Sequence, residues 1–354
     1  MIPGASRLMR AATVLGVITG LALALSPAPS GAEAFGDTAI GGGARALSLG
    51  EGGAAAATGA ESLFWTPAGI AGSPEPEFLL GHTSWVQDLN NEAGAAVLPL
   101  GGLGVVGVSG SWQTLSGIEE RDAAGNLVKK LSLTTGNGNL AFAREFGSHA
   151  SFGVSGGFRI QNGVGINKKA IPVGLGFGAD IGEVRLGLSA VGVLAPLPAY
   201  QASLAWRLKS GGVGLLLMGG AVLRQDEDRV GAGLEAEVGK VLRLRAGYMA
   251  PFQESGLDGF SNLTAGIGLA YRTLSIDYAF LPLGDLGQVH RVQVSLRMLD
   301  RAPTGAASAP APAAAAAAPP TGPTATTAEP AKPKKDVEME FVVPAKAASA
   351  QPAP

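Results

Sequence analysis

The sequence predicts an all-β fold, an antiparallel transmembrane β-barrel of about 14 strands. Apolar and polar residues alternate with a period of two over many short segments, which places the two sets on opposite faces of strands. The connections between these segments are alternately long or charged and tight, as in barrels with long outer loops and short periplasmic turns. With 54 Gly and only 15% charged residues, the composition favours strands and tight turns over long helices.

Composition also excludes some classes of function. The 354-residue chain has a net charge of −2, whereas a nucleic-acid-binding protein needs a basic surface. The absence of cysteine rules out disulfides and thiolate metal sites. Aromatic residues make up only 6%, which is few for two full interfacial girdles and counts against a barrel.

Residues 1–34 are predicted to be a signal peptide. Arg7 and Arg10 precede an uncharged apolar run at residues 11–25, and Ala32-Glu33-Ala34 fits a small-x-small cleavage site. The alternative is a retained anchor, but the run is shorter than the roughly 20 residues that a spanning helix needs. We therefore expect the mature chain to lie beyond the inner membrane.

Residues 35–74 are rich in Gly and Ala and show no strand alternation. The strings GARALSLGEGG (43–53) and ESLFWTPAGIA (61–71) resemble the N-terminal segment of the PorV/PorQ family, relatives of the FadL fatty-acid transporters. The resemblance extends to the C-terminal LSIDYAFLPLGDLGQVHRVQVSLRM, and Thr66 stands where the family usually has asparagine. It implies that this segment folds inside the barrel as a hatch, with a motif formed by Arg45, Gly50, Phe64, Trp65, Pro67 and Gly69.

The barrel itself is expected between residues 75 and 299. The clearest hairpin is 274–298, in which Val292, Val294 and Leu296 alternate with polar residues and each strand has the length of a tilted membrane-spanning strand. Alternation and turn residues predict strands at 77–86, 93–98, 103–114, 139–146, 150–161, 170–179, 184–193, 199–208, 213–223, 229–238, 241–250, 262–271, 274–280 and 289–298.

The predicted long or charged connections are at residues 87–92, 115–138, 162–169, 224–228, 251–261 and 281–288. Two uncharged runs, 93–118 and 186–206, are long enough to suggest membrane helices, but both contain proline and many small residues. We therefore expect strands there.

Residues 300–354 are dominated by Ala and Pro and cannot bury a core, so a disordered periplasmic tail is expected. Residues 332–343 have the character of a linear motif for a periplasmic protein partner that binds by strand addition. The alternative is a tail without a partner.

Motifs for catalysis are weak. Gly102, Gly104 and Gly107 match a dinucleotide fingerprint but lack its strand–helix context, and the elbow-like Gly153–Gly157 lies within an alternating strand. His82, His149 and His290 have no metal-ligand spacing, and the acidic residues 226–228 suit a solvated loop better than a calcium site. We expect no enzyme activity, no cofactor and no metal.

A set of charged residues falls on the polar face of the strands and is expected to face the lumen, because charge on the lipid face near the midplane costs about 2–4 kcal/mol. Its members are Arg159, Arg207, Glu235, Glu237, Arg243, Arg245, Asp277, Arg291 and Arg297. They would line a conduit or form an ion-pair network that fills the lumen and holds the hatch. The network is favoured, since opposite charges are interleaved and the barrel has little open volume.

Two functions follow from the resemblance. The first is a non-enzymatic docking or anchoring component of a cell-envelope machine in the outer membrane, which the tail favours. The alternative is a FadL-like passive transporter of hydrophobic small molecules, which predicts an apolar pocket near Phe64, Trp65 and Ile70. Outer-membrane lipid is a partner of either, and nucleic acid of neither.

Overall fold

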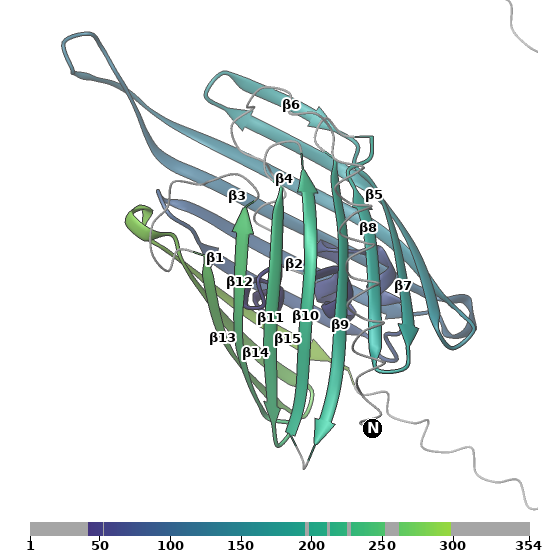
Figure 1. Ribbon diagram of the computed structural model, residues 1–354. Helices are drawn as coiled ribbons and strands as arrows, with labels where there is room; N and C mark the ends of the chain where they lie inside the picture. Colours follow the sequence, from purple (N-terminus) through teal and green to yellow (C-terminus); the bar gives the residue numbers. More distant parts are fainter. Residues whose placement is uncertain are drawn as a thin grey trace, which may run out of the picture. The chain divides into compact units, whose positions relative to one another are not determined.

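The chain forms a closed barrel of 14 antiparallel strands, which confirms the predicted fold class (Figure 1). The computed structural model describes residues 42–51, 53–194, 198–210, 213–224, 228–251 and 262–298. The predicted signal peptide, the first part of the predicted hatch at 35–41, and the predicted tail at 300–354 lie outside these residues.

The barrel strands are close to those that alternation predicts. They are β1 (Glu77–Ser84), β2 (Leu89–Pro99), β3 (Val105–Arg121), β4 (Leu127–Phe146), β5 (Ala150–Gly163), β7 (Val173–Ile181), β8 (Val184–Val191), β9 (Ala199–Ser210), β10 (Val213–Arg224), β11 (Arg229–Val238), β12 (Leu242–Pro251), β13 (Leu263–Tyr271), β14 (Leu274–Pro282) and β15 (Gln288–Arg297). A short strand, β6 (Ile166–Ala170), and two 3-10 turns, η3 (Gly101–Leu103) and η4 (Gly284–Leu286), lie in the connections.

Each barrel strand pairs with the two that neighbour it in sequence order, and β1 pairs with β15 to close the ring. The closing pair is continuous, from Glu77 opposite Arg297 to Ser84 opposite His290. Both ends of the described sheet therefore meet, and no barrel edge is left unpaired.

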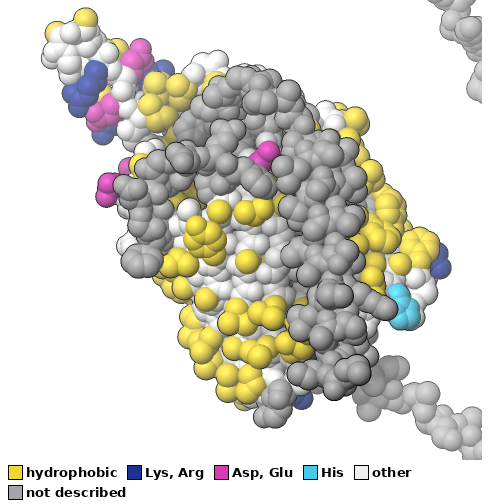
Figure 2. Space-filling model, in the orientation of Figure 1, with side chains coloured by type: hydrophobic (Ala, Val, Ile, Leu, Met, Phe, Trp, Pro, Cys, Tyr) yellow, Lys and Arg dark blue, Asp and Glu magenta, His cyan; other side chains and the backbone are white. Residues whose placement is uncertain are grey.

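Side chains alternate between the lumen and the exterior, as the period-two pattern requires. On β15, Val292, Val294 and Leu296 are exposed, whereas Arg291, Gln293 and Ser295 are buried inside. Figure 2 shows the exterior on the visible face, where hydrophobic side chains spread across the wall and charged side chains gather toward the ends. An apolar exterior around a polar interior is the arrangement of a membrane barrel.

The predicted connections at 115–138 and 162–169 are wrong. β3 runs on to Arg121 and β4 begins at Leu127, so a paired hairpin replaces most of the first loop. β6 pairs with β5 across the second. These extensions carry charges on both faces, so the alternation of apolar and polar residues is lost while the backbone pairing continues. Opposite charges such as Glu119 and Lys130 face one another there and favour the pairing.

The two uncharged runs that resemble membrane helices are strands, as expected: the first lies in β2 and β3, the second in β8 and β9. Within the described part of the chain, no helix combines the length and apolar character required to cross a bilayer.

Residues 42–74 form four short helical pieces inside the barrel, where Figure 1 shows them in purple, and we call these described residues the hatch. The pieces are α2 (Ala44–Ser48), α3 (Gly53–Ala56), η1 (Gly59–Phe64) and η2 (Pro67–Ile70). α2 contacts β12 to β15, α3 contacts β8 to β10, η1 contacts β1 to β3, and η2 contacts β3, β4, β5 and β7. The hatch thus touches the wall almost all the way round.

Candidate functional site

The hatch folds as short pieces because its sequence interrupts every helix. Gly43 and Gly50 adopt positive φ angles of 106° and 75° at either side of α2, conformations that favour glycine. Pro67 begins η2, and the Thr66 hydroxyl accepts a hydrogen bond of 3.3 Å from the Ala68 N–H. Thr66 therefore acts as the N-cap that an asparagine would provide at this position.

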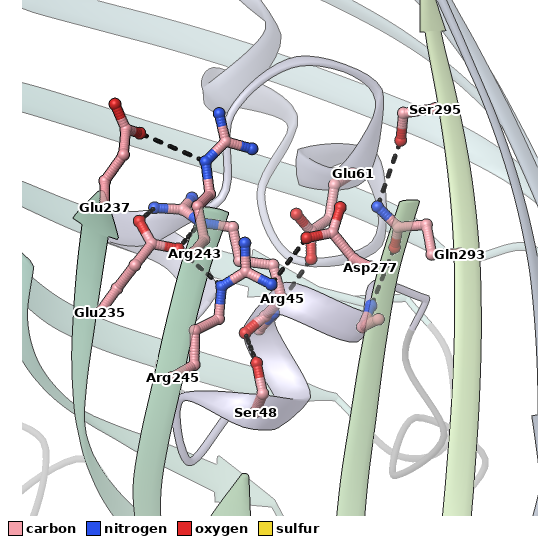
Figure 3. A network of polar contacts seen from close by, with 12 residues as sticks. Arg45, Ser48, Glu61, Glu235, Glu237, Arg243, Arg245, Asp277, Gln293 and Ser295 are labelled. Carbon is pink, nitrogen blue, oxygen red and sulfur yellow. Dashed lines mark hydrogen bonds and ion pairs between the residues drawn. The ribbon is translucent and has the colours of Figure 1, made fainter. Parts of the chain in front are cut away.

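Arg45 of the hatch binds the wall at the centre of a charge network (Figure 3). Its Nε and Nη2 donate to the two carboxylate oxygens of Glu235 on β11 at 2.8 and 2.9 Å, and its Nη1 donates to the Ala56 carbonyl at 2.6 Å. A bidentate guanidinium–carboxylate pair of this kind is strong and fixes orientation. Arg45 thereby joins α2 to both α3 and the barrel.

The network continues through the wall. Arg245 on β12 is fully buried and donates to Glu235 at 2.7 Å and to Asp277 on β14 at 2.6 Å. The network is therefore a row of ion pairs in which two arginines alternate with two carboxylates, contributed by the hatch and by three strands. Buried charges are tolerated in this form because each cation faces an anion.

The other predicted lumenal charges lie near this network or apart from it. Arg243 pairs with Glu237 at 3.2 Å, and Arg297 pairs with Glu77 at 3.1 Å, both toward the end with short turns, which we call the turn end. Arg207 lines a cavity at the same end. Arg159 is separate: its Nε donates to Asn137 on β4 at 2.9 Å. Arg291 binds the hatch, donating to the Gly43 carbonyl at 3.1 Å.

Of the remaining predicted hatch residues, Trp65 has a direct bonding role. Its indole N–H donates to the Gly42 carbonyl at 3.0 Å, and its own carbonyl accepts from Ser189 on β8 at 2.7 Å. Phe64 packs beside it. Gly69 lies against Ser62, where an added Cβ would overlap, so it lets η1 and η2 pack closely.

Several hatch-to-wall bonds were not expected from the sequence. The backbone N–H groups of Ala44 and Ala55 donate to Gln293 and Ser203, and Thr264 donates to the Ser48 carbonyl. Arg229 on β11 pairs with Glu51 at 3.1 Å. Uncharged strand residues such as Ser203 carry no signal of these roles in the sequence.

Glycines on the inner wall provide the surface on which the hatch rests. At Gly247, an added Cβ would lie 2.5 Å from the Gly50 nitrogen, and at Gly231 it would overlap the Gly50 carbonyl. The same close approach of hatch backbone occurs at Gly153, Gly187 and Gly233. Hatch backbone packs directly on wall backbone at these positions, which is possible only because glycine has no side chain.

Glu61, like Glu51, is a charged residue of the hatch that the predicted motif omits. Its carboxylate accepts from the Ala46 N–H at 3.0 Å and lies beside Arg45 in Figure 3. Burial raises the pKa of Glu61 to about 7, and the nearby Arg45 only partly offsets this. The one available signal was that Glu61 is the only charge between residues 54 and 71.

Cavities lie at both ends of the barrel. The first, of about 270 Å³, opens at the turn end and is polar, with Arg45, Glu61, Arg207 and Glu237 in its lining. The second, of about 750 Å³, is an apolar groove at the opposite end, which we call the loop end, lined by Leu115, Ile118, Leu133, Val164 and Ile166 among others. A pocket of only about 20 Å³ lies near Phe64 and Trp65, so the predicted apolar pocket at the hatch is small.

No family model matches the chain, and no curated protein is similar to it in sequence. Solved structures are similar in fold. The toluene transporter TbuX of Ralstonia pickettii is 13% identical, with a TM-score of 0.53 over 73% of this chain and 99% of that one. The monoaromatic hydrocarbon channel TodX, in a deltaS2S3 mutant, is 13% identical, with a TM-score of 0.51 over 72% and 97%.

A Pseudomonas aeruginosa FadL homologue is 11% identical, with a TM-score of 0.50 over 72% of this chain and 98% of that one. The fold is FadL-like. At these identities the likeness shows the fold alone; it agrees with the FadL side of the sequence resemblance and does not confirm the PorV/PorQ assignment. Two of these proteins are named as a transporter and a channel, and the third as a FadL homologue.

The weak motifs lie in structural positions. The glycine pattern at 102–107 spans η3 and the start of β3, and the elbow-like residues lie within β5. Each histidine bonds locally: His82 with Glu92, His149 with Ser148, and His290 with Tyr278. In the described ranges, no three His, Asp or Glu residues cluster as metal ligands.

Proposed function

We propose that this protein is a passive transporter of hydrophobic small molecules across the outer membrane, with the hatch as its gate. The observation that carries the proposal is the pair of cavities on either side of the hatch: an apolar groove at the loop end and a polar cavity at the turn end. The apolar exterior supports the location in a membrane, and the hydrocarbon channel and the toluene transporter among the fold neighbours support the class of cargo.

The groove is suited to collecting apolar molecules. Its lining includes five aliphatic side chains, and it lies at the loop end of the barrel. Concave apolar sites of several hundred Å³ are typical of small-molecule binding. Beyond the groove the hatch blocks the lumen, since Leu47, Leu49 and Ile70 are fully buried against the wall.

Uptake of the hydrophobic dye N-phenyl-1-naphthylamine by cells with a lipopolysaccharide outer membrane tests transport. Cells producing the protein should take up the dye faster than cells without it, and Leu133→Asp in the groove should remove the gain at equal barrel abundance. Leu140→Asn, on the outer face of the same strand, is the matched control. No gain over cells without the protein would refute the proposal.

The gate is tested by locking the hatch. Because the chain has no cysteine, A55C/S203C adds a single crosslink where the Ala55 N–H meets the Ser203 hydroxyl at 2.7 Å. Oxidation should stop uptake and reduction should restore it. Full uptake through the oxidised form would show that the hatch is not the gate.

The docking role expected from the sequence has less support. The feature that favoured it, the tail beyond residue 300, lies outside the described residues, and the fold neighbours reported above are a channel, a transporter and a FadL homologue. The transporter is therefore the function proposed here, ahead of the docking component.

A further inference from the structure

One inward-facing side chain from each of six neighbouring strands forms a continuous line across the wall, which we call the polar row. The members, in order from β15 through β1, β2, β3 and β4 to β5, are Arg291, Thr83, Asn91, Gln113, Thr135 and Gln161. Each is the direct cross-strand partner of the next, so their side chains are close neighbours. All six bear hydrogen-bonding groups, and only Arg291 is charged.

The polar row has unused hydrogen-bonding capacity. Asn91 is 1% exposed, yet both its amide nitrogen and its amide oxygen lack a partner among the described residues. The Gln113 Nε2 and the Arg291 Nη2 are also buried and have no hydrogen-bond partner among the described residues. Buried polar atoms without partners are rare because each costs about 1–3 kcal/mol, so a concentration of them on adjacent strands indicates a site for something absent.

The unused atoms are mainly donors. The amide nitrogens of Asn91 and Gln113 and the guanidinium of Arg291 offer N–H groups, against one unused oxygen on Asn91. The Arg291 Nε and Nη1 already donate hydrogen bonds, to the Thr83 hydroxyl at 2.8 Å and to the Gly43 carbonyl of the hatch. The complementary ligand group is therefore an oxygen acceptor.

The polar row also lies directly below the apolar groove. On β3, Gln113 is two residues from the groove residue Leu115, and on β4, Thr135 is two residues from Leu133. Residues two apart on a strand share a face and are separated by about 7 Å. The polar row therefore lies one step further into the lumen than Leu115 and Leu133, and its unpartnered atoms are buried beneath the groove lining.

We propose that the polar row is a recognition site for the oxygen acceptor of a small amphipathic molecule whose apolar body occupies the loop-end groove. This inference rests on the proposed transport function and narrows its cargo from hydrocarbons to oxygenated apolar molecules. A carbonyl or carboxylate oxygen would accept from Asn91 and Gln113, while the ring or chain beside it would contact Leu115 and Leu133.

Ligand-detected NMR on the purified protein in detergent tests the site with toluene, benzaldehyde and benzoate, which share one ring and differ in the acceptor. Benzaldehyde should bind about tenfold or more tightly than toluene, the ratio expected when buried donors gain a partner. Benzoate shows whether the acceptor is preferred neutral or ionised, and binding of either acceptor above toluene supports the site.

The variant N91L/Q113L should reduce benzaldehyde binding to the level of toluene and leave toluene binding unchanged. Thr114→Val, on the opposite face of β3, is the control and also corrects for partition into the micelle. Asn91→Asp keeps the side-chain shape while removing its N–H donors, so it should weaken benzaldehyde binding even if the double variant does not fold.

Equal affinity of the wild type for toluene and for both acceptors would overturn the inference and leave ordered water as the occupant of the polar row. A preference that survives N91L/Q113L or Asn91→Asp would overturn it too. These equilibrium measurements need no transport. If the wild-type protein gave no gain in dye uptake, the proposed function would therefore be refuted while the recognition site could still stand.

Discussion

Glu235 should be the most sensitive single residue in the attachment of the hatch, more sensitive than Arg45, its partner on the hatch. Glu235 faces two arginines, with Arg45 at 2.8 Å and Arg245 at 2.7 Å. Glu235→Gln leaves both cations without this anion, whereas Arg45→Gln leaves Glu235 still paired to Arg245. The asymmetry follows from the geometry of the network.

The magnitudes differ accordingly. Removing one partner of a buried ion pair costs about 3–5 kcal/mol, which we expect for Glu235→Gln because Arg245 is fully buried. Arg45→Gln loses charge-assisted hydrogen bonds and should cost about 1.5–3 kcal/mol. At about 1.4 kcal/mol per tenfold, the hatch should open roughly 150-fold or more often in the first variant and about 10- to 150-fold more often in the second.

Thiol labelling measures these openings, because the natural chain has no cysteine. Ser62→Cys places one thiol of similar shape in the hatch, where Ser62 is 0% exposed. The labelling rate then reports how often the hatch leaves the wall. Arg121→Gln, which breaks an exposed pair with Glu119, should leave the rate unchanged.

The order of the two variants decides the result. If Arg45→Gln labels as fast as Glu235→Gln, the predicted asymmetry is wrong, and if neither differs from the parent while the barrel stays folded, the network does not hold the hatch. A double-mutant cycle between the two positions should then show no coupling.

Three further outcomes are expected. Gly247→Ala should displace the hatch at a cost of about 1–3 kcal/mol, seen as faster Ser62→Cys labelling, whereas Gly219→Ala, whose Cβ would be 3.8 Å from its nearest neighbour, should not. Docking of the hatch should weaken as pH rises from about 4.5 to 7, because Glu61 keeps its proton in the docked state but releases it in the undocked state at its ordinary pKa of 4.5. Labelling of Ser62→Cys across this range should show the effect, which should level off above pH 7 and vanish in Glu61→Gln. Asp122→Ala should make the tip of the β3–β4 hairpin more sensitive to protease without changing the melting temperature of the barrel. The Asp122 carboxylate accepts hydrogen bonds from Asn126 and from the backbone, which lower its pKa, and these bonds stabilise only that turn.

The sequence predicted the barrel well because its signal is local. Leu274–Pro282 and Gln288–Arg297 alternate residue by residue, so the lipid and lumen faces follow from the pleat without knowledge of any partner. The same logic failed at residues 115–138, where the strands extend as a charged hairpin and backbone pairing alone maintains them. Alternation of apolar and polar residues indicates which strand segments face lipid, but it does not indicate where backbone pairing between strands ends.

The site was predictable only in part. The polar-face charges Glu235, Arg245 and Asp277 could be assigned to the lumen, but their joining to Arg45 depends on closing the ring and docking the hatch, which brings residues 190 positions apart into contact. The wall glycines and the polar row likewise depend on strand register, since Asn91 and Gln113 become neighbours only when β2 and β3 pair. Sequence determined which face each side chain takes, because that is a property of one strand; the tertiary structure decided which side chains meet, because that is a property of the closed ring.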